Sequence, residues 1–188
     1  MSKAKLFVIS GPSGCGKGTV LVQLLERHPE LFYSVSATTR APRAGMETDG
    51  VQYHFLSREA FEEMIRRDGF IEYKQYCDNL YGTPRQPVED AMAAGRSVIL
   101  EIETEGMREV VRQYPDCVTV FIAPPSLEVL AQRLAGRQSE SEEKRNKRLR
   151  RAAEELMRKN DYQYVVVNDA LEDAVEALDQ IYCAEIEK

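Results

Sequence analysis

The sequence predicts an α/β fold in which helices flank a mostly parallel sheet. Short apolar runs alternate along the chain with segments whose apolar residues recur at helical spacing. A glycine-rich stretch separates the first apolar run from the first helical segment, as at the start of a βαβ unit. Both features are typical of parallel strands joined by crossover helices.

The first half of the chain contains one strand–helix unit of the core and one segment of different composition and residue pattern. The apolar run 5–10 predicts a buried strand, and residues 19–28 predict a helix that ends near Pro29. Residues 33–83 hold more than half of the tyrosines, and short alternating pieces flank a helical stretch at 57–69. We therefore expect a small insert of strands and one helix there, outside the main sheet.

The second half of the chain returns to alternating strands and helices. Charged residues dominate 139–159, which predicts a loop followed by a solvated helix, and Gly136 is expected to interrupt the helix before it. The predicted strands are 97–103, 117–125 and 164–169, and the other predicted helices are 84–95, 126–137 and the C-terminal segment.

Composition and charge narrow the function classes. The 188 residues suit one domain with small inserts, and 43% of them are hydrophobic. A net charge of −6 argues against bulk nucleic-acid binding, which depends on neutralising phosphates. No apolar run is long enough to span a membrane, so we expect a cytoplasmic protein without membrane or nucleic-acid partners. The oligomeric state is not predicted.

The cysteines and histidines give little sign of metal chemistry. Four scattered cysteines and two histidines predict free thiols, without a disulfide frame, a zinc site or a histidine-rich metal centre. Cys15 lies in the glycine-rich stretch near the start of a predicted helix, where a thiol can have a lowered pKa. One hypothesis is that alkylation of Cys15 blocks the site beside it. The alternative is that Cys15 is a spacer.

The strongest motif is GPSGCGKGT, residues 11–19, which fits the pattern G-x-x-x-x-G-K. Its glycines let successive backbone N–H groups wrap an anion, and the following helix points its free N–H groups at the same place. Lys17 adds a charge for the β- and γ-phosphates. The alternative is a glycine-rich turn without a ligand. The predicted ATP-binding residues here are Gly11, Pro12, Ser13, Gly14, Cys15, Gly16, Lys17, Gly18 and Thr19.

One position in this motif departs from the usual form. Gly18 stands where a Ser or Thr normally offers a hydroxyl to Mg²⁺, and Thr19 comes next. Mg²⁺ keeps several water ligands readily, so the departure does not exclude the ion. We expect Thr19, the nucleotide phosphates or water molecules to hold it.

The predicted insert carries a second set of anion-binding residues. Arg40 and Arg43 lie close together in SVSATTRAPR, and two guanidinium groups suit a phosphate dianion. Tyr53 and Tyr81 could donate to a phosphate or pack on a base, but they could equally be core residues of the insert. The two arginines could likewise be ordinary surface residues.

Taken together, these motifs resemble those of guanylate kinases. GPSGCGKGT, SVSATTRAPRAGME, FIEY, LYGTP, FIAPPS and VVVND occur in that family's order, from about Leu6 to the C-terminal helix. The resemblance implies a P-loop kinase fold, with a small α+β GMP-binding insert and a helical lid, in one domain of about residues 4–184. The implied parts are a core of residues 1–33, 84–125 and 160–188, an insert of residues 34–83 and a lid region of residues 126–159.

The resemblance also assigns the acceptor site. Glu72 is expected to accept hydrogen bonds from N1–H and N2–H₂ of guanine, whereas adenine would leave this carboxylate unpaired or repelled. Discrimination in sites built this way is on the order of 10⁴-fold. By resemblance Arg40, Arg43, Tyr53 and Tyr81 bind the GMP phosphate, and Ser36, Glu72 and Thr83 face the base.

Two further carboxylates end the predicted strand 97–103. Glu101 and Glu103 are two residues apart, so on a strand they project to one face, at the edge where α/β sheets bind ligands. The resemblance places both near GMP and the magnesium waters. Glu105 stands where the family commonly has Gln and adds negative charge. The alternative is a pair of solvated charges at a strand end.

The charged segment after the third strand supplies the expected lid. By resemblance Arg133, Arg137 and Arg148 close over the phosphates, and a solvated helix is the alternative. Asn168 matches a position near the adenine of ATP, although an Asn after a strand is otherwise only a turn signal. The expected catalytic residues are Lys17, Arg43, Arg133, Arg137 and Arg148.

The function implied by the resemblance is transfer of the ATP γ-phosphoryl group to GMP, and to dGMP, in purine nucleotide metabolism and GMP recycling. The expected cofactors are ATP and Mg²⁺. The rivals are an inactive guanylate-kinase-like interaction module, a kinase for another nucleotide or a phosphorylated sugar, and a switch GTPase. The first conflicts with the intact Gly16 and Lys17, the second with the tyrosine and glutamate set, and the third with the missing N-K-x-D motif.

Overall fold

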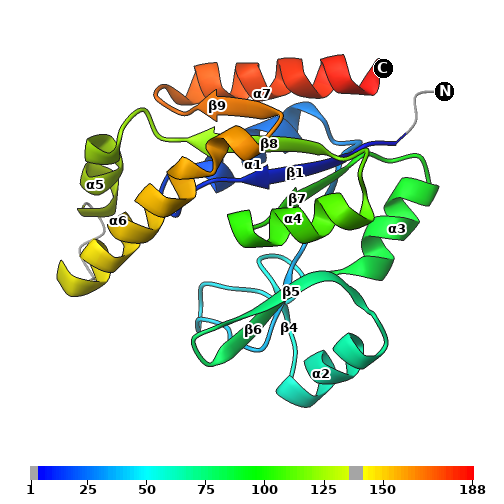
Figure 1. Ribbon diagram of the computed structural model, residues 1–188. Helices are drawn as coiled ribbons and strands as arrows, with labels where there is room; N and C mark the ends of the chain where they lie inside the picture. Colours follow the sequence, from blue (N-terminus) through cyan, green and yellow to red (C-terminus); the bar gives the residue numbers. More distant parts are fainter. Residues whose placement is uncertain (1–3, 136–141) are drawn as a thin grey trace.

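A five-stranded parallel sheet forms the centre of the fold (Figure 1), seen in a computed structural model that describes residues 4–135 and 142–188. Each strand runs parallel to its neighbours, with Ile9 opposite Glu101 on one side and Val120 on the other. Across the sheet the strands are β2 (Phe32–Ser34), β7 (Val98–Glu101), β1 (Leu6–Ser10), β8 (Val118–Ala123) and β9 (Tyr164–Val167).

Helices cover both faces of this sheet. On one face α1 (Lys17–Arg27) and α7 (Leu171–Ile186) bury Leu24 and Leu178 against strand residues such as Ile9. On the other face α3 (Arg85–Ala93) and α4 (Thr104–Gln113) pack in a second cluster that includes Val8 and Val110. Because both faces are covered, the central strands read as continuous apolar runs.

A second, four-stranded sheet lies beside the core, below α4 in the view of Figure 1. In spatial order its strands are β4 (His54–Phe55), β3 (Ala37–Thr38), β6 (Asn79–Pro84) and β5 (Phe70–Tyr76). Only the β3–β4 pair is parallel. α2 (Arg58–Arg66) covers this sheet and begins at Ser57, whose hydroxyl accepts a hydrogen bond from the N–H of Ala60.

Two helices, α5 (Leu127–Ala135) and the charged α6 (Glu142–Met157), lie beside the carboxyl edge of the main sheet. α5 packs against α6 through Leu130, Leu134 and Ala152. A short 3-10 turn, η1 (Lys159–Asp161), leads on to β9. No helix within 4–135 or 142–188 is long and apolar enough to cross a membrane.

The structure confirms the predicted α/β class with its parallel sheet and corrects three details. The main sheet contains a further strand, β2, which was not predicted because it lies at the start of the tyrosine-rich segment 33–83. The predicted strand 97–103 ends at Glu101, so Glu103 is instead the N-cap residue of α4. The first helix begins at Lys17, two residues before the apolar periodicity.

Replacing Phe61 with Ala should destabilise the lobe built on the second sheet. Phe61 is fully buried and stacks on Phe70 with ring centroids 4.2 Å apart, in a cluster completed by Ala37 and Leu80. Truncating a buried Phe costs about 3–5 kcal/mol. Urea unfolding should show this loss, whereas Glu62→Ala, at a half-buried surface position of the same helix, should change stability by less than about 1 kcal/mol. A cost below about 1 kcal/mol for Phe61→Ala would contradict the packing described.

Candidate active site

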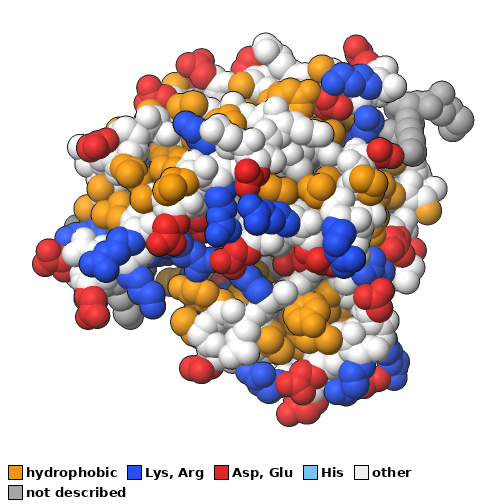
Figure 2. All heavy atoms as spheres, in the orientation of Figure 1, with side chains coloured by type: hydrophobic (Ala, Val, Ile, Leu, Met, Phe, Trp, Pro, Cys, Tyr) orange, Lys and Arg blue, Asp and Glu red, His pale blue; other side chains and the backbone are white. Residues whose placement is uncertain are grey.

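Two adjoining cavities open at the carboxyl edge of the main sheet, between the core, the second sheet and α6. The first, of about 400 Å³, lies against the glycine-rich loop, and the second, of about 240 Å³, lies against β5 and β6. They share six lining residues, Ser36, Tyr53, Tyr76, Glu101, Ile102 and Glu103. Figure 2 shows basic and acidic side chains gathered between the core and the second sheet.

The glycine-rich loop packs too tightly for side chains at two of its glycines. A Cβ on Gly11 would lie 2.1 Å from the carbonyl oxygen of Ile122. Gly16 has φ of +91°, and a Cβ there would lie 2.4 Å from the side-chain nitrogen of Asn168. No side chain caps the N-terminus of α1, and its first turn contains no acidic residue. The exposed N–H groups and helix dipole therefore favour an anion.

Asn168 and Arg133 fix the position of the glycine-rich loop through hydrogen bonds to its backbone. The buried Asn168 amide donates to the carbonyl of Cys15 over 2.7 Å. Arg133 donates to the Asn168 carbonyl over 3.0 Å and to the Cys15 carbonyl over 3.5 Å. These bonds give both residues a positioning role that the sequence did not suggest. The expected contact of Asn168 with adenine and the lid role of Arg133 stay predictions.

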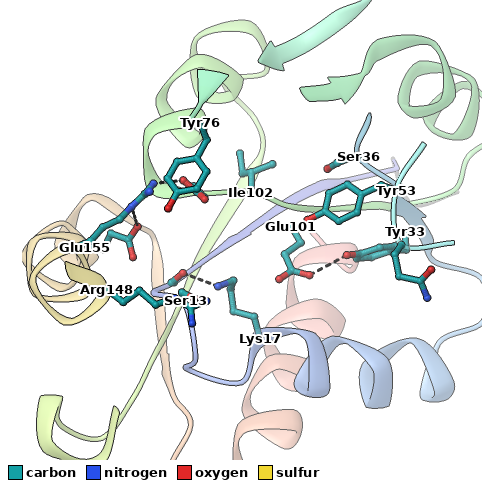
Figure 3. A pocket seen from close by; sticks show the side chains of 14 residues that line it. Ser13, Lys17, Tyr33, Ser36, Tyr53, Tyr76, Glu101, Ile102, Arg148 and Glu155 are labelled. Carbon is teal, nitrogen blue, oxygen red and sulfur yellow. Dashed lines mark hydrogen bonds and ion pairs between the residues drawn. The ribbon is translucent and has the colours of Figure 1, made fainter. Parts of the chain in front are cut away.

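Basic groups meet at the mouth of the loop (Figure 3). Lys17 Nζ donates to the carbonyls of Gly11 and Pro12, over 2.7 and 3.3 Å. Arg148, from α6, donates to Ser13 Oγ over 3.3 Å. The structure therefore brings together the predicted residues Lys17 and Arg148, from parts of the chain more than 130 residues apart. Arg137, the third predicted lid arginine, lies outside the described residues.

Thr19 and Gly18 are exposed in the first turn of α1 and lie outside the lining of the two cavities. Oxygen ligands that suit a hard cation line the first cavity instead, on Glu101 and Glu103. Glu101 accepts a hydrogen bond from Tyr33 over 2.9 Å, and burial raises the pKa of this tyrosine. The expected magnesium contact of Thr19 stays a prediction.

The arginines predicted for an acceptor phosphate differ in their surroundings. Arg40 donates twice to Glu47, over 2.8 and 2.9 Å, and stacks over Tyr53 and Phe55. These hydrogen bonds lower the pKa of Glu47 to about 2. Arg43 is exposed, and its backbone N–H also donates to Glu47, while its carbonyl accepts from the N–H groups of Met46 and Glu47. The structure thus places Arg40 beside the cavity tyrosine and leaves the Arg43 guanidinium outside both cavity linings.

Glu72 lies in the second cavity with its carboxylate held on two sides. Thr83 Oγ1 donates to Glu72 Oε1 over 2.6 Å. On the other side a Cβ on Gly106 of α4 would lie 2.8 Å from Oε2, so only glycine leaves room for the carboxylate in this position. Burial raises the pKa of Glu72. Tyr81 lines the same cavity, with its ring 6.0 Å from that of Tyr53.

An ionic junction joins the three structural parts around the cavities. Lys74 of β5 and Arg151 of α6 both pair with Glu103 at the start of α4. Arg151 also donates to Glu155 over 3.2 Å and lies over the ring of Tyr76, 5.2 Å from its centroid. Burial lowers the pKa of Lys74 and raises the pKa of Glu155. Glu103 therefore acts as the shared counter-ion of β5 and α6.

Sequence reasoning missed most of this junction, although spacing offered a signal. Lys74 is two residues from Glu72 on a strand, so both side chains project to one face. Arg151 and Glu155 follow Arg148 at three and seven residues along α6, which places them on the same side of a helix. Glu47, the partner of Arg40, carried no such signal because it lies in an irregular loop.

The structure contradicts the hypothesis of a reactive Cys15. Its side chain is fully buried, packed in the core cluster behind the loop. Burial raises the pKa of the thiol and outweighs the opposing effect of nearby Lys17. A helix N-terminus lowers a thiol pKa only where the thiolate remains solvated and faces the dipole. Cys15 is thus a core residue within the loop.

A family comparison matches almost the entire chain. The family model described as guanylate kinase matches residues 3–185. The guanylate kinase of Desulfitobacterium hafniense (strain Y51) is 51% identical over 180 residues, covering 96% of this chain and 90% of that protein. The guanylate kinase of Synechococcus sp. (strain CC9311) is 48% identical, covering 95% and 94%. Among solved structures, guanylate kinase from Anaplasma phagocytophilum has a TM-score of 0.81 at 34% identity, covering 100% of this chain and 88% of that one.

Thiol labelling should distinguish Cys15 from the exposed Cys77. We expect a small maleimide to modify Cys77, in the β5–β6 turn, while Cys15 remains unmodified, because Cys77 is exposed to solvent and Cys15 is buried. Peptide mass spectrometry would measure both sites in one sample, with urea-unfolded protein as the fully reactive control. Labelling of native Cys15 as fast as Cys77 would show that the loop does not shield the thiol.

Proposed function

The chain belongs to the guanylate kinase family, and we propose that its two adjoining cavities hold the two substrates, ATP and GMP, with their phosphates facing each other. The protein is an ATP:GMP phosphotransferase, which transfers the γ-phosphoryl group of ATP to GMP and yields ADP and GDP. One observation supports this assignment most directly. The cavity that contains Lys17 and the cavity that contains Glu72 lie side by side and share the lining residues Glu101 and Glu103.

The glycine-rich loop and the start of α1 are proposed to hold the ATP phosphates. The N–H groups at this helix start are not capped by a side chain, and Lys17 Nζ needs only to exchange the carbonyls of Gly11 and Pro12 for phosphate oxygens. Arg148 extends from α6 to the same loop. We assign Lys17 and Arg148 to stabilising the charge that builds on the transferred group.

Glu72 is proposed to select guanine by its two oxygens. A carboxylate held by Thr83 and backed by Gly106 has a fixed orientation, which suits the adjacent N1–H and N2–H₂ donors of guanine. Adenine offers no donor at N1, so its binding would leave the second carboxylate oxygen, Glu72 Oε2, without a partner.

The GMP phosphate is proposed to lie near Tyr53, Tyr81 and Arg40. Arg40 donates two N–H groups to Glu47 and a third to the carbonyl of Ala41, which holds the guanidinium over the Tyr53 ring and leaves its remaining N–H groups for the phosphate. Arg43 would complete the clamp by a movement of its exposed side chain. A monophosphate oxygen is already ionised, so the transfer needs positioning and charge neutralisation and no dedicated base.

Mg²⁺ is proposed to bind with ATP at the wall formed by Glu101 and Glu103. Carboxylate oxygens there fit the preference of this hard cation, and Thr19 or water would supply further oxygens. When bound, the ion neutralises charge on the phosphates of ATP. Glu101 is oriented for such a role by the hydrogen bond that it accepts from Tyr33. Glu103 already pairs with Lys74 and Arg151, so binding of the ion would weaken or displace these ion pairs.

We also propose that the acceptor-binding insert, residues 34–83, and the lid helices α5 and α6 move around the core; residues 136–141 of the expected lid region 126–159 lie outside the described residues. Each part contributes to the junction at Glu103, so nucleotide entry must open or rearrange it. Closure would exclude water and limit ATP hydrolysis. Because the contacts proposed for the acceptor involve its base and phosphate, dGMP should also be accepted. Phosphorylation of GMP would give the protein its role in purine nucleotide metabolism and GMP recycling.

A nucleotide acceptor screen tests the proposed selectivity. Purified protein with ATP and Mg²⁺ would be offered GMP, dGMP, AMP, CMP, UMP and a sugar phosphate, and ADP formation would be followed by a coupled assay. We expect GMP and dGMP to react and AMP to be disfavoured on the order of 10⁴-fold. Comparable rates with AMP, or no ADP with any acceptor, would refute the proposal.

Lys17→Ala should nearly abolish turnover because no other side chain in the loop supplies the positive charge. We expect kcat/KM for ATP to fall by far more than tenfold. Retention of more than about a tenth of the wild-type value, a loss below about 1.4 kcal/mol, would contradict the role of Lys17. Lys188→Ala, at the C-terminal end of the chain, is the matched control and should keep wild-type activity.

Gly106→Ala should weaken GMP binding without weakening the fold. The added methyl group would displace the Glu72 carboxylate, so we expect KM for GMP to rise at least about tenfold (about 1.4 kcal/mol) while KM for ATP stays unchanged. Alanine is favoured over glycine in a helix by about 1 kcal/mol, so the melting temperature should not fall much. Arg108→Ala, on the exposed side of α4, is the control. An unchanged KM for GMP in Gly106→Ala would show that Glu72 tolerates displacement.

A further inference from the structure

A cluster of metal-ligating side chains lies at the end of α1 remote from the glycine-rich loop. Among the described residues, His28, Asp179 and Cys183 each offer one ligand atom, and these atoms lie within 4.8 Å of one another. His28 is the C-cap residue of α1, whereas Asp179 and Cys183 lie on α7. All three side chains are half-buried, so an ion could reach them from solvent. None of the three takes part in the proposed phosphoryl transfer.

The two residues of α7 have the spacing of a helical chelate. Asp179 and Cys183 are four residues apart, so their side chains lie one above the other on the same helix face. Cys183 Sγ lies 3.8 Å from Asp179 Oδ1. Ligand atoms at about 2.0–2.3 Å from a tetrahedral zinc ion are roughly 3.3–3.8 Å apart. These two ligands therefore need little or no movement to share an ion.

His28 completes the set with its ring nitrogen Nε2, which contacts Asp179 Oδ1. An ion between these atoms would replace their direct hydrogen bond. Arg27 donates to the other oxygen of the same carboxylate, Asp179 Oδ2, over 3.4 Å. Arg27 thus orients the carboxylate and leaves Oδ1 directed at His28 and Cys183.

A second, independent feature is the support of the histidine ring. Glu30 Oε1 lies 2.9 Å from His28 Nδ1, and Glu30 itself accepts a hydrogen bond from Tyr182 over 3.1 Å. The Tyr182 ring also packs edge-on against the His28 ring, with centroids 4.5 Å apart. Histidines that ligate metals characteristically donate their other nitrogen to a carboxylate, which fixes the tautomer and ring orientation. Glu30 would hold the proton on Nδ1 and leave Nε2 free to ligate.

We propose that His28, Asp179 and Cys183 form a binding site for Zn²⁺ or a divalent transition metal of similar softness, with water as the fourth ligand. One imidazole, one thiolate and one carboxylate form a ligand set that suits such ions. Mg²⁺ prefers oxygen ligands in near-octahedral geometry, so the ion that accompanies ATP would not compete well here. Because the ligands come from two helices, the bound ion would clamp the end of α1 to α7.

Cobalt spectroscopy tests this site directly. The full-length protein, treated with chelator and a phosphine reductant and kept free of nucleotide, would be titrated with Co²⁺. We expect a stoichiometric thiolate-to-cobalt charge-transfer band that Zn²⁺ abolishes by displacement. Cys183→Ser should eliminate the band, and Cys77→Ser, which removes an exposed cysteine elsewhere, should keep it. Glu30→Gln should keep the band and weaken the affinity about 10–100-fold.

A second measurement guards against misfolded variants. In a Cys77→Ser background, Zn²⁺ should raise the melting temperature, because an ion that binds only the folded state stabilises it. Adding Cys183→Ser should remove this increase while kinase turnover stays at the Cys77→Ser level. The absence of a cobalt band, a band that survives Cys183→Ser, or an equal zinc-induced increase in both variants would overturn the proposal.

Discussion

The parallel register of β1 and its two neighbours is the constraint on which the rest of the structure depends. Ile9 lies opposite Glu101 and Val120, so the chain leaves β1, β7 and β8 at one edge of the sheet. The glycine-rich loop, the carboxylate wall and the N-terminus of α4 all begin there. Open α/β sheets bind ligands at this edge because successive turns and helix N-termini converge on it.

The second sheet is joined to this edge through α4. The same helix begins at Glu103, the partner of Lys74, and contains Gly106, against which the Glu72 carboxylate rests. β5 is thereby fixed to the core by an ion pair and by close packing within one turn of α4. Arg151 brings α6 to the same carboxylate, so a single residue, Glu103, connects the core, the second sheet and the candidate lid.

Most of the fold, the glycine-rich loop and the candidate role of Glu72 could be predicted from the sequence. Few of the contacts between the loop and the second sheet could be. The loop was predictable because a phosphate-binding turn requires glycine and lysine at fixed positions. Glu72 was accessible only through family resemblance. β2 escaped because three residues show no periodicity, and the pairs Arg40–Glu47 and Arg151–Glu103 depend on tertiary proximity. The Cys15 hypothesis failed because sequence position does not reveal burial.

The most direct test of the account is the binding preference for guanine that rests on the Glu72 carboxylate. Isothermal titration would compare GMP and AMP on wild-type protein and on Glu72→Gln, whose amide keeps the shape but presents a donor where guanine also has donors. The account predicts a strong preference for GMP in the wild type and its loss, by weaker GMP binding, in the variant. An unchanged preference in Glu72→Gln would show that another group reads the base.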